Sequence, residues 1–228
     1  MSMDIESDKL TTLLNISGKQ RMLSQRIIFF LAYIDRCISK NQSIQSDLTS
    51  LKDSVASFKN GHMTIKQGNS LIGIPKISIA EITNILYTQN GDQIIEDFIT
   101  NVEMLTTDLE SGRTNVYSDK LDRIIKLAKN DLLNILNKIT ATIEVEVHRI
   151  SKENMDRLQT NRQQVLKMLG HITDISKQTR MISFNAHIIA SRAGSWGKEF
   201  SVVADGIDKL VKQINGHVDK AMKYLNIE

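Results

Sequence analysis

Residues 13–37 read LLNISGKQRMLSQRIIFFLAYIDRC. Apolar side chains recur here three and four residues apart, with one polar interruption at Gln20. The repeating positions are Leu13, Ile16, Gln20, Leu23, Ile27, Phe30, Ile34 and Cys37. This spacing places one apolar stripe along an α-helix and is also typical of coiled coils. The segment is therefore predicted to be an amphipathic helix that packs against other helices.

The same spacing continues along nearly the whole chain. Before residue 147 it marks three more helical segments, at residues 44–58, 79–109 and 118–147. Residues 60–78 contain three glycines and the only proline, which predicts a loop. Asn90-Gly91-Asp92 is compatible with either a kink or a split in the third segment. Four amphipathic helices with short connections predict a four-helix bundle over residues 1–147.

Residues 148–228 have a different organisation. Apolar positions at helical spacing occur in residues 165–189 and 200–221, on either side of a turn at residues 194–197. This pattern predicts an antiparallel coiled-coil hairpin with its tip near Trp196. Because two helices alone make only a thin core, we expect the hairpin to pair with a second copy as a homodimer. The predicted fold class is all-α, with a bundle that continues into this hairpin.

Composition excludes several other classes of protein. The 228 residues include 11 Gly and one Pro, whereas average usage would supply roughly 27 of the two together. A sheet-rich chain would need more turn residues than this. The 29 basic and 26 acidic residues are interspersed and give a net charge of +3. We therefore expect no nucleic-acid binding through the phosphate backbone.

Membrane spans and disulfides are also not expected. The longest apolar run, residues 27–34, is much shorter than the roughly 20 residues that cross a bilayer. A single cysteine, Cys37, cannot form an internal disulfide. With no signal peptide visible, a lone thiol is typical of a reducing cytoplasm. We therefore expect a soluble, cytoplasmic protein.

A candidate ligand site lies at residues 17–26, SGKQRMLSQR, within the first segment. Helical geometry places five of its residues on one side, namely Ser17, Gly18, Arg21, Ser24 and Gln25. If two such helices meet in a dimer, Arg21 faces the partner's Arg21. Two guanidinium groups repel unless an anion lies between them, and they suit planar anions with several oxygens. The alternative is that Arg21 and Arg26 form only surface ion pairs.

This segment resembles the sequence box of the PilJ-type sensor domain, found in type IV pilus chemoreceptors and in nitrate/nitrite sensor histidine kinases. The resemblance is sharp over residues 17–26 and loose over the rest of the chain to about residue 147. It implies that Arg21 holds an anion at the dimer interface and that Arg26 is the second arginine of the box. Membrane spans usually flank this domain in the family, and without one the ligand is expected in the cytoplasm.

Residues 172–210 resemble the signalling tip of methyl-accepting chemotaxis receptors, including ASRAG at 190–194 and GKEFSVVAD at 197–205. The resemblance covers both legs of a shortened hairpin and its turn. It implies that the tip binds the adaptor CheW and the kinase CheA, or other chemoreceptors. The implied contact residues are Gln178, Phe184, Asn185, Arg192, Gly194, Gly197, Phe200 and Val202. Lys177 and Ile189 replace the family's usual Phe and Glu, which implies weak or absent trimers of dimers.

These features predict a chemoreceptor-like signal transducer and not an enzyme. Its bundle would sense a small anion of the nitrate/nitrite class, and its hairpin tip would signal to the chemotaxis kinase. One alternative is a ligand-free helical scaffold or modulator of chemoreceptor arrays. Another is a haem or metal redox sensor, which would depend on the scattered histidines His62, His148, His171, His187 and His217. Because such histidines more often have ordinary hydrogen-bonded roles, no metal or other cofactor is expected.

Overall fold

The computed structural model describes residues 2–76, 79–114 and 117–225, with side chains described from residue 8 onward. Regular structure within these ranges is helical, apart from one isolated bridge between Asn69 and Ile74. The all-α fold class with a helical bundle and a hairpin is confirmed. No helix within the described ranges is apolar enough over a sufficient length to span a bilayer. The chain divides into two compact units, Met1–Lys152 and Glu153–Glu228.

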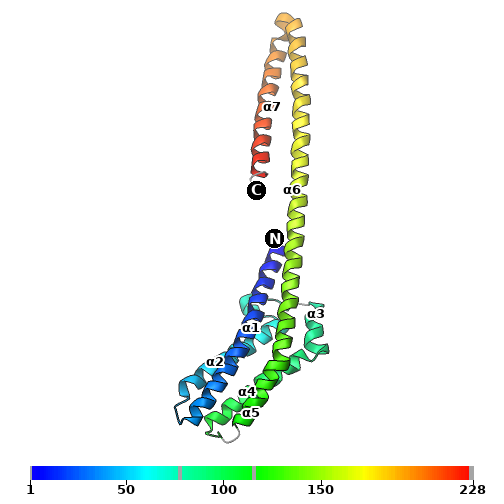
Figure 1. Ribbon diagram of the computed structural model, residues 1–228. Coiled ribbons are helices and arrows are strands. Elements are labelled where there is room, and N and C mark those ends of the chain that lie inside the picture. Colours follow the sequence, from blue (N-terminus) through cyan, green and yellow to red (C-terminus); the bar gives the residue numbers. More distant parts are fainter. Residues whose placement is uncertain (1, 77–78, 115–116, 226–228) are drawn as a thin grey trace. The chain divides into compact units, whose positions relative to one another are not determined.

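The first unit is built from long helices around one apolar core (Figure 1). Its elements are α1 (Ser2–Ser39), α2 (Gln45–Gln67), η1 (Ser70–Ile72), α3 (Ala80–Thr83), the π-turn η2 (Asn84–Thr88), α4 (Gly91–Glu110), α5 (Tyr117–Leu127), the π-turn η3 (Ala128–Leu132) and the first part of α6 (Leu133–Arg192). The predicted stripe of the first segment faces this core, since Leu13, Leu23, Ile27, Ile34 and Cys37 are buried. Burial of this stripe orients α1 in the bundle.

The loop predicted at residues 60–78 is shorter in the structure. α2 continues to Gln67, and the helix ends at Gly68, which has a φ of 79°. The helix passes through Gly61, where a Cβ atom would overlap the side-chain amide of Gln20 on α1. Glycine favours loops in a sequence, but here its missing side chain lets two helices pack closely.

The third predicted segment is split at Asn90 and not merely kinked. Asn90 has a left-handed φ of 58°, and α4 begins at the next residue, Gly91. Gly91 is buried, and a Cβ atom there would lie 2.6 Å from the carbonyl oxygen of Ile85 and 3.0 Å from Cγ2 of Ile135. Glycine is therefore required for the close packing at this helix start.

The variant Gly91→Ala is expected to lower the free energy of unfolding by about 1–3 kcal/mol, the usual effect of overpacking a core. The reason is that the Ile85 carbonyl belongs to the backbone and cannot rotate away as a side chain would. Chemical denaturation followed by circular dichroism measures this difference. An unfolding curve that superimposes on the wild-type curve would contradict the prediction.

The second unit is the antiparallel hairpin. The part of α6 beyond residue 152 leads to η4 (Gly194–Gly197), and α7 (Lys198–Leu225) returns beside α6, as Figure 1 shows in yellow and orange to red. The buried residues between the two helices recur every seven positions and are mostly small, namely Ser176, Ser183 and Ala190 on α6 and Ala204, Val211 and Val218 on α7. We call these six residues the seam. Ser183 Oγ donates a hydrogen bond to the carbonyl oxygen of Ala204 at 2.8 Å.

Most of the predicted hairpin stripe lies outside the seam. Ten of its large apolar side chains are exposed, namely Val165, Met168, Ile172, Ile175, Ile182, Ile189, Phe200, Val203, Leu210 and Ile214. We call these ten residues the open stripe. The hydrophobic effect favours burying such a row, and the small residues of the seam leave the two helices without a wide core of their own. Pairing with a second copy therefore stays a prediction of this hairpin.

Candidate functional site

Residues 17–26 lie in the middle of α1, but two of the predicted site residues point into the bundle. Ser17 is only 1% exposed, and its Oγ donates a hydrogen bond to Oγ1 of Thr140 on α6 at 2.9 Å. Ser24 is also buried, and its Oγ donates to the carbonyl oxygen of Arg21 at 2.8 Å. Gln20 lies between these serines along the helix, and its buried Oε1 has no hydrogen-bond partner among the described residues.

The other predicted residues of this motif are exposed. Arg21 makes no side-chain ion pair with any residue in the described ranges, so the ion-pair alternative for it is not supported within one chain. Arg26 instead lies over the Phe30 ring, with its guanidinium carbon 5.5 Å from the ring centroid. No atom lies within 4 Å of the position that a Cβ of Gly18 would occupy. Gln25 is exposed beside them, so the outward side of the motif combines two cations with open space.

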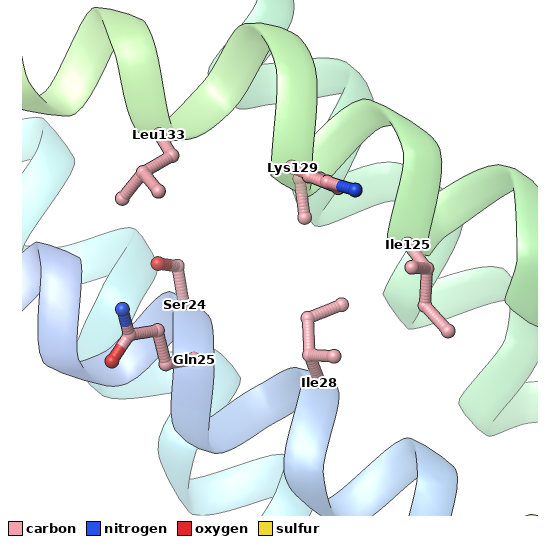
Figure 2. A pocket seen from close by; sticks show the side chains of 7 residues that line it. Ser24, Gln25, Ile28, Ile125, Lys129 and Leu133 are labelled. Carbon is pink, nitrogen blue, oxygen red and sulfur yellow. The ribbon is translucent and has the colours of Figure 1, made fainter.

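A pocket of about 210 Å³ lies beside the motif, between α1 and the helical segment that includes the π-turn η3. Its walls are formed by Ser24, Gln25, Ile28, Ile125, Ala128, Lys129 and Leu133. Figure 2 shows the Ser24 hydroxyl directed into the space between the helices, with Ile28 and Ile125 forming apolar walls. The structure thus brings Ser24 and Gln25 together at one pocket, while Arg21 is not part of its lining.

A second polar cluster joins α2 and α4. His62 is 1% exposed, and its Nε2 lies 2.9 Å from Oδ1 of Asp92 and 3.9 Å from Oε1 of Glu96. Lys66 Nζ donates a hydrogen bond to Oδ2 of Asp92 at 2.7 Å. Burial lowers the pKa of His62, although the hydrogen bond with Asp92 acts to raise it. Burial also acts to raise the pKa of Asp92, but hydrogen bonds from Lys66 and His62 hold that pKa below its usual range.

This cluster was not predicted, because residues 60–78 were expected to form a loop. A usable signal was present, since His62 and Lys66 are four residues apart, as are Asp92 and Glu96. Within the described ranges these three residues, His62, Asp92 and Glu96, are the one group of His, Cys, Asp and Glu side chains close enough to hold a metal ion. His171 and His217 are both exposed on the hairpin, and neither belongs to this group.

The hairpin tip presents most of its predicted contact residues to solvent. The exposed residues are Gln178, Phe184, Asn185, Arg192, Gly194, Phe200 and Val202. Gly197 differs from these residues because it is buried, and a Cβ atom there would overlap the backbone carbonyl of Ala190. Gly194 has a φ of 57°, which favours glycine in this turn. The turn therefore requires its two glycines for different reasons.

Side chains from both legs meet just below the tip. Oγ of Ser201 lies 3.3 Å from Nδ1 of His187, and Oδ1 of Asp205 lies 3.4 Å from Nε2 of the same ring. Of the two residues that depart from the receptor pattern, Lys177 pairs with Asp174 at 3.3 Å. The other, Ile189, is exposed. Both side chains are thus accessible to a neighbouring molecule, and their effect on trimers of dimers stays a prediction.

Comparison with known proteins gives matches in both parts of the chain. Residues 130–218 match the methyl-accepting chemotaxis protein signalling domain. Residues 6–86 match the N-terminal domain of type IV pili methyl-accepting chemotaxis transducers. Both parts of the chain are thus similar to parts of chemotaxis receptors. No solved structure matches the chain.

Individual relatives are similar over shorter segments. The methyl-accepting chemotaxis protein CtpM of Pseudomonas aeruginosa is 35% identical over 89 residues, which cover 36% of this chain and 16% of CtpM. The biofilm dispersion protein BdlA of the same species is 33% identical over 103 residues, covering 45% of this chain and 22% of BdlA. The putative sensory transducer protein YvaQ of Bacillus subtilis is 32% identical over 94 residues, covering 41% of this chain and 16% of YvaQ.

The chain therefore spans less than a quarter of the length of each of these three relatives. Chemotaxis receptors of this kind are signal transducers rather than enzymes.

Proposed function

We propose that this protein is a homodimeric signal transducer that senses a small anion of the nitrate/nitrite class. The anion would bind at residues 17–26, and the hairpin tip would signal to the kinase CheA and the adaptor CheW. The observation that carries the sensing role is that Arg21 is exposed and has no ion pair within the described residues. An unpaired guanidinium beside the open space at Gly18 is suited to an anion with several oxygen atoms.

An exposed apolar face on α1 supports pairing of this helix with a second copy. Met22, Phe29 and Tyr33 are all exposed, and they lie on the side of α1 that faces away from its own core. The rings of Phe29 and Tyr33 stack with their centroids 6.2 Å apart. Contact between two copies along this face would bury these side chains. Arg21 lies at the edge of the face, about 80–120° around α1 from the three, and the proposal places the partner's Arg21 opposite it across that edge. An anion between the two would then relieve their repulsion.

The hairpin supports the signalling half of the proposal. Its open stripe would form the core of a four-helix bundle in the dimer, and its tip residues remain exposed for an adaptor or kinase. α6 is one helix that contributes residues to both units and ends at the tip. A ligand that favours one arrangement of α1 could therefore shift a population of α6 conformations. A cytoplasmic location, like the named partners, is part of this proposal.

The test compares Arg21→Ala with Arg26→Ala. Nitrate or nitrite at millimolar concentration is expected to raise the melting temperature of the wild type and of Arg26→Ala, but not that of Arg21→Ala. The two arginines differ because five helical steps place Arg26 about 140° around α1 from Arg21. Differential scanning fluorimetry measures the shift, calorimetry measures binding, and circular dichroism checks that all three proteins keep their helicity.

Other outcomes would favour the alternatives. If neither anion binds the wild type at millimolar concentration, the sensing proposal is wrong and the ligand-free scaffold becomes the better account. A Soret absorption band in the purified protein would instead favour the haem sensor.

A further inference from the structure

Four polar side chains converge where α2 packs on α4. His62 and Lys66 lie one turn apart on α2, and Asp92 and Glu96 lie one turn apart on α4. We propose that His62, Asp92 and Glu96 form a binding site for a divalent first-row transition-metal ion such as Zn²⁺. This site is separate from Arg21 and would give the sensor unit a second input.

The separations of the three ligand atoms fit a small metal ion. Nε2 of His62 lies 2.9 Å from Oδ1 of Asp92 and 3.9 Å from Oε1 of Glu96. All three atoms lie within 4.8 Å of one another. Zinc bonds of about 2.0–2.2 Å to nitrogen and oxygen place tetrahedral ligand atoms roughly 3.3–3.6 Å apart. Small side-chain rotations would therefore centre all three atoms on one ion, and water would complete the coordination.

The charge of the cluster also suits a cation. The two carboxylates supply negative charge, and Lys66 balances part of it. Lys66 binds Oδ2 of Asp92, which leaves Oδ1 directed at His62. Partners of this kind hold metal-binding carboxylates in orientation.

The chemistry of the donor set narrows the choice of ion. Mg²⁺ and Ca²⁺ prefer oxygen ligands, whereas an imidazole nitrogen favours zinc and its transition-metal neighbours. The ion can reach the site from solvent, because the side chain of Glu96 is 40% exposed although His62 is buried. Without an ion, the same groups form an ion-pair network between α2 and α4. The experiment must therefore distinguish a metal site from this network.

The full chain, stripped of metal with a chelator, is titrated with Co²⁺, whose visible absorption bands report its coordination. We expect one equivalent of Co²⁺ to bind and to be displaced by Zn²⁺. Glu96→Gln is expected to weaken Co²⁺ binding at least about tenfold, because even the partners of metal ligands contribute roughly 10–100-fold to affinity. The substitution preserves side-chain shape at a half-exposed position, so the fold should persist.

Glu103→Gln is the matched control. Glu103 lies two turns further along α4, is also half-exposed, and pairs with Lys59 at 3.0 Å. This variant should bind Co²⁺ as the wild type does. The proposal is overturned if the wild type shows no Co²⁺ bands up to millimolar metal, or if Glu96→Gln and Glu103→Gln bind Co²⁺ equally well. The second result would place the ion at other histidines. The nitrate response depends on Arg21 and should survive Glu96→Gln, so the two proposals can fail independently.

Discussion

The variant Leu210→Glu is expected to be a monomer of 25.8 kDa under conditions where the wild type has twice that mass. Leu210 is 59% exposed on α7 and belongs to the open stripe. In the proposed dimer this stripe becomes the core of a four-helix bundle. Burying an ionised carboxylate there without a partner is strongly unfavourable, so the charged side chain would keep the two hairpins apart.

The monomer should also lose helicity in its hairpin. The seam consists of alanine, serine and valine side chains, and helices in proteins gain most of their stability from packing an apolar face against a neighbour. We therefore expect Leu210→Glu to reduce the circular-dichroism signal of the hairpin as well as the mass. Multi-angle light scattering at micromolar concentration measures the mass directly.

Lys212→Glu is the control for this experiment. Lys212 is exposed on the same helix, and two helical steps place it about 200° from Leu210. The control changes the net charge by more than Leu210→Glu does, yet it should leave the dimer intact. A monomeric wild type, or a dimeric Leu210→Glu variant, would show that the open stripe does not join two copies.

The hairpin also shows why a sequence predicts the position of a helix more readily than the residues through which that helix packs on another. Helical spacing in residues 165–189 and 200–221 correctly predicts two helices and their turn. It does not reveal the seam, because Ser176, Ser183 and Ala190 contribute little to an apolar pattern. Small residues let two backbones approach each other, and they leave the large apolar residues on the outside. The strongest hydrophobic signal in this part of the sequence therefore marks an uncovered surface and not the contact within the hairpin.

Residues 17–26 show a similar difference between what helical spacing predicts and what packing determines. At 100° per residue, Ser17 and Ser24 lie toward one side of Arg21, while Gly18 and Gln25 lie toward the other. The boundary between the buried and exposed sides of α1 falls within this arc, so the serines are buried and the other residues are not. Helical spacing groups these residues, but only the packing of α1 in the bundle separates them.

The His62 cluster depends on tertiary structure to a greater extent than residues 17–26 do, because its members lie on two helices. Its members lie on α2 and α4, and the chain between them includes the residues that were expected to form a longer loop. Gly61, next to His62, contributed to that wrong prediction. Its missing side chain in fact accommodates Gln20, so the helix continues and carries His62 toward Asp92.

The variant Gly197→Ala is expected to disrupt the hairpin tip and its binding to an adaptor or kinase. A Cβ atom at this position would overlap the carbonyl oxygen of Ala190 and lie 2.7 Å from its carbonyl carbon. Ala190 is the seam residue nearest the turn, so its backbone cannot move away without loosening the contact between α6 and α7. We expect the free energy of hairpin unfolding to fall by about 1–3 kcal/mol or more.

Gly206→Ala provides the matched comparison on α7. No atom lies within 4 Å of a Cβ atom at this position, so alanine should raise stability by roughly 0.5–1 kcal/mol through its better helix propensity. Denaturation followed by circular dichroism measures the opposite signs of the two effects, and calorimetry with purified CheW measures binding. In the proposed mechanism only Gly197→Ala loses that binding, because only this change alters the turn that positions Arg192 and Phe200 on either side of it. Wild-type stability and CheW binding in Gly197→Ala would show that the turn can shift without affecting the surface on which signalling is proposed to depend.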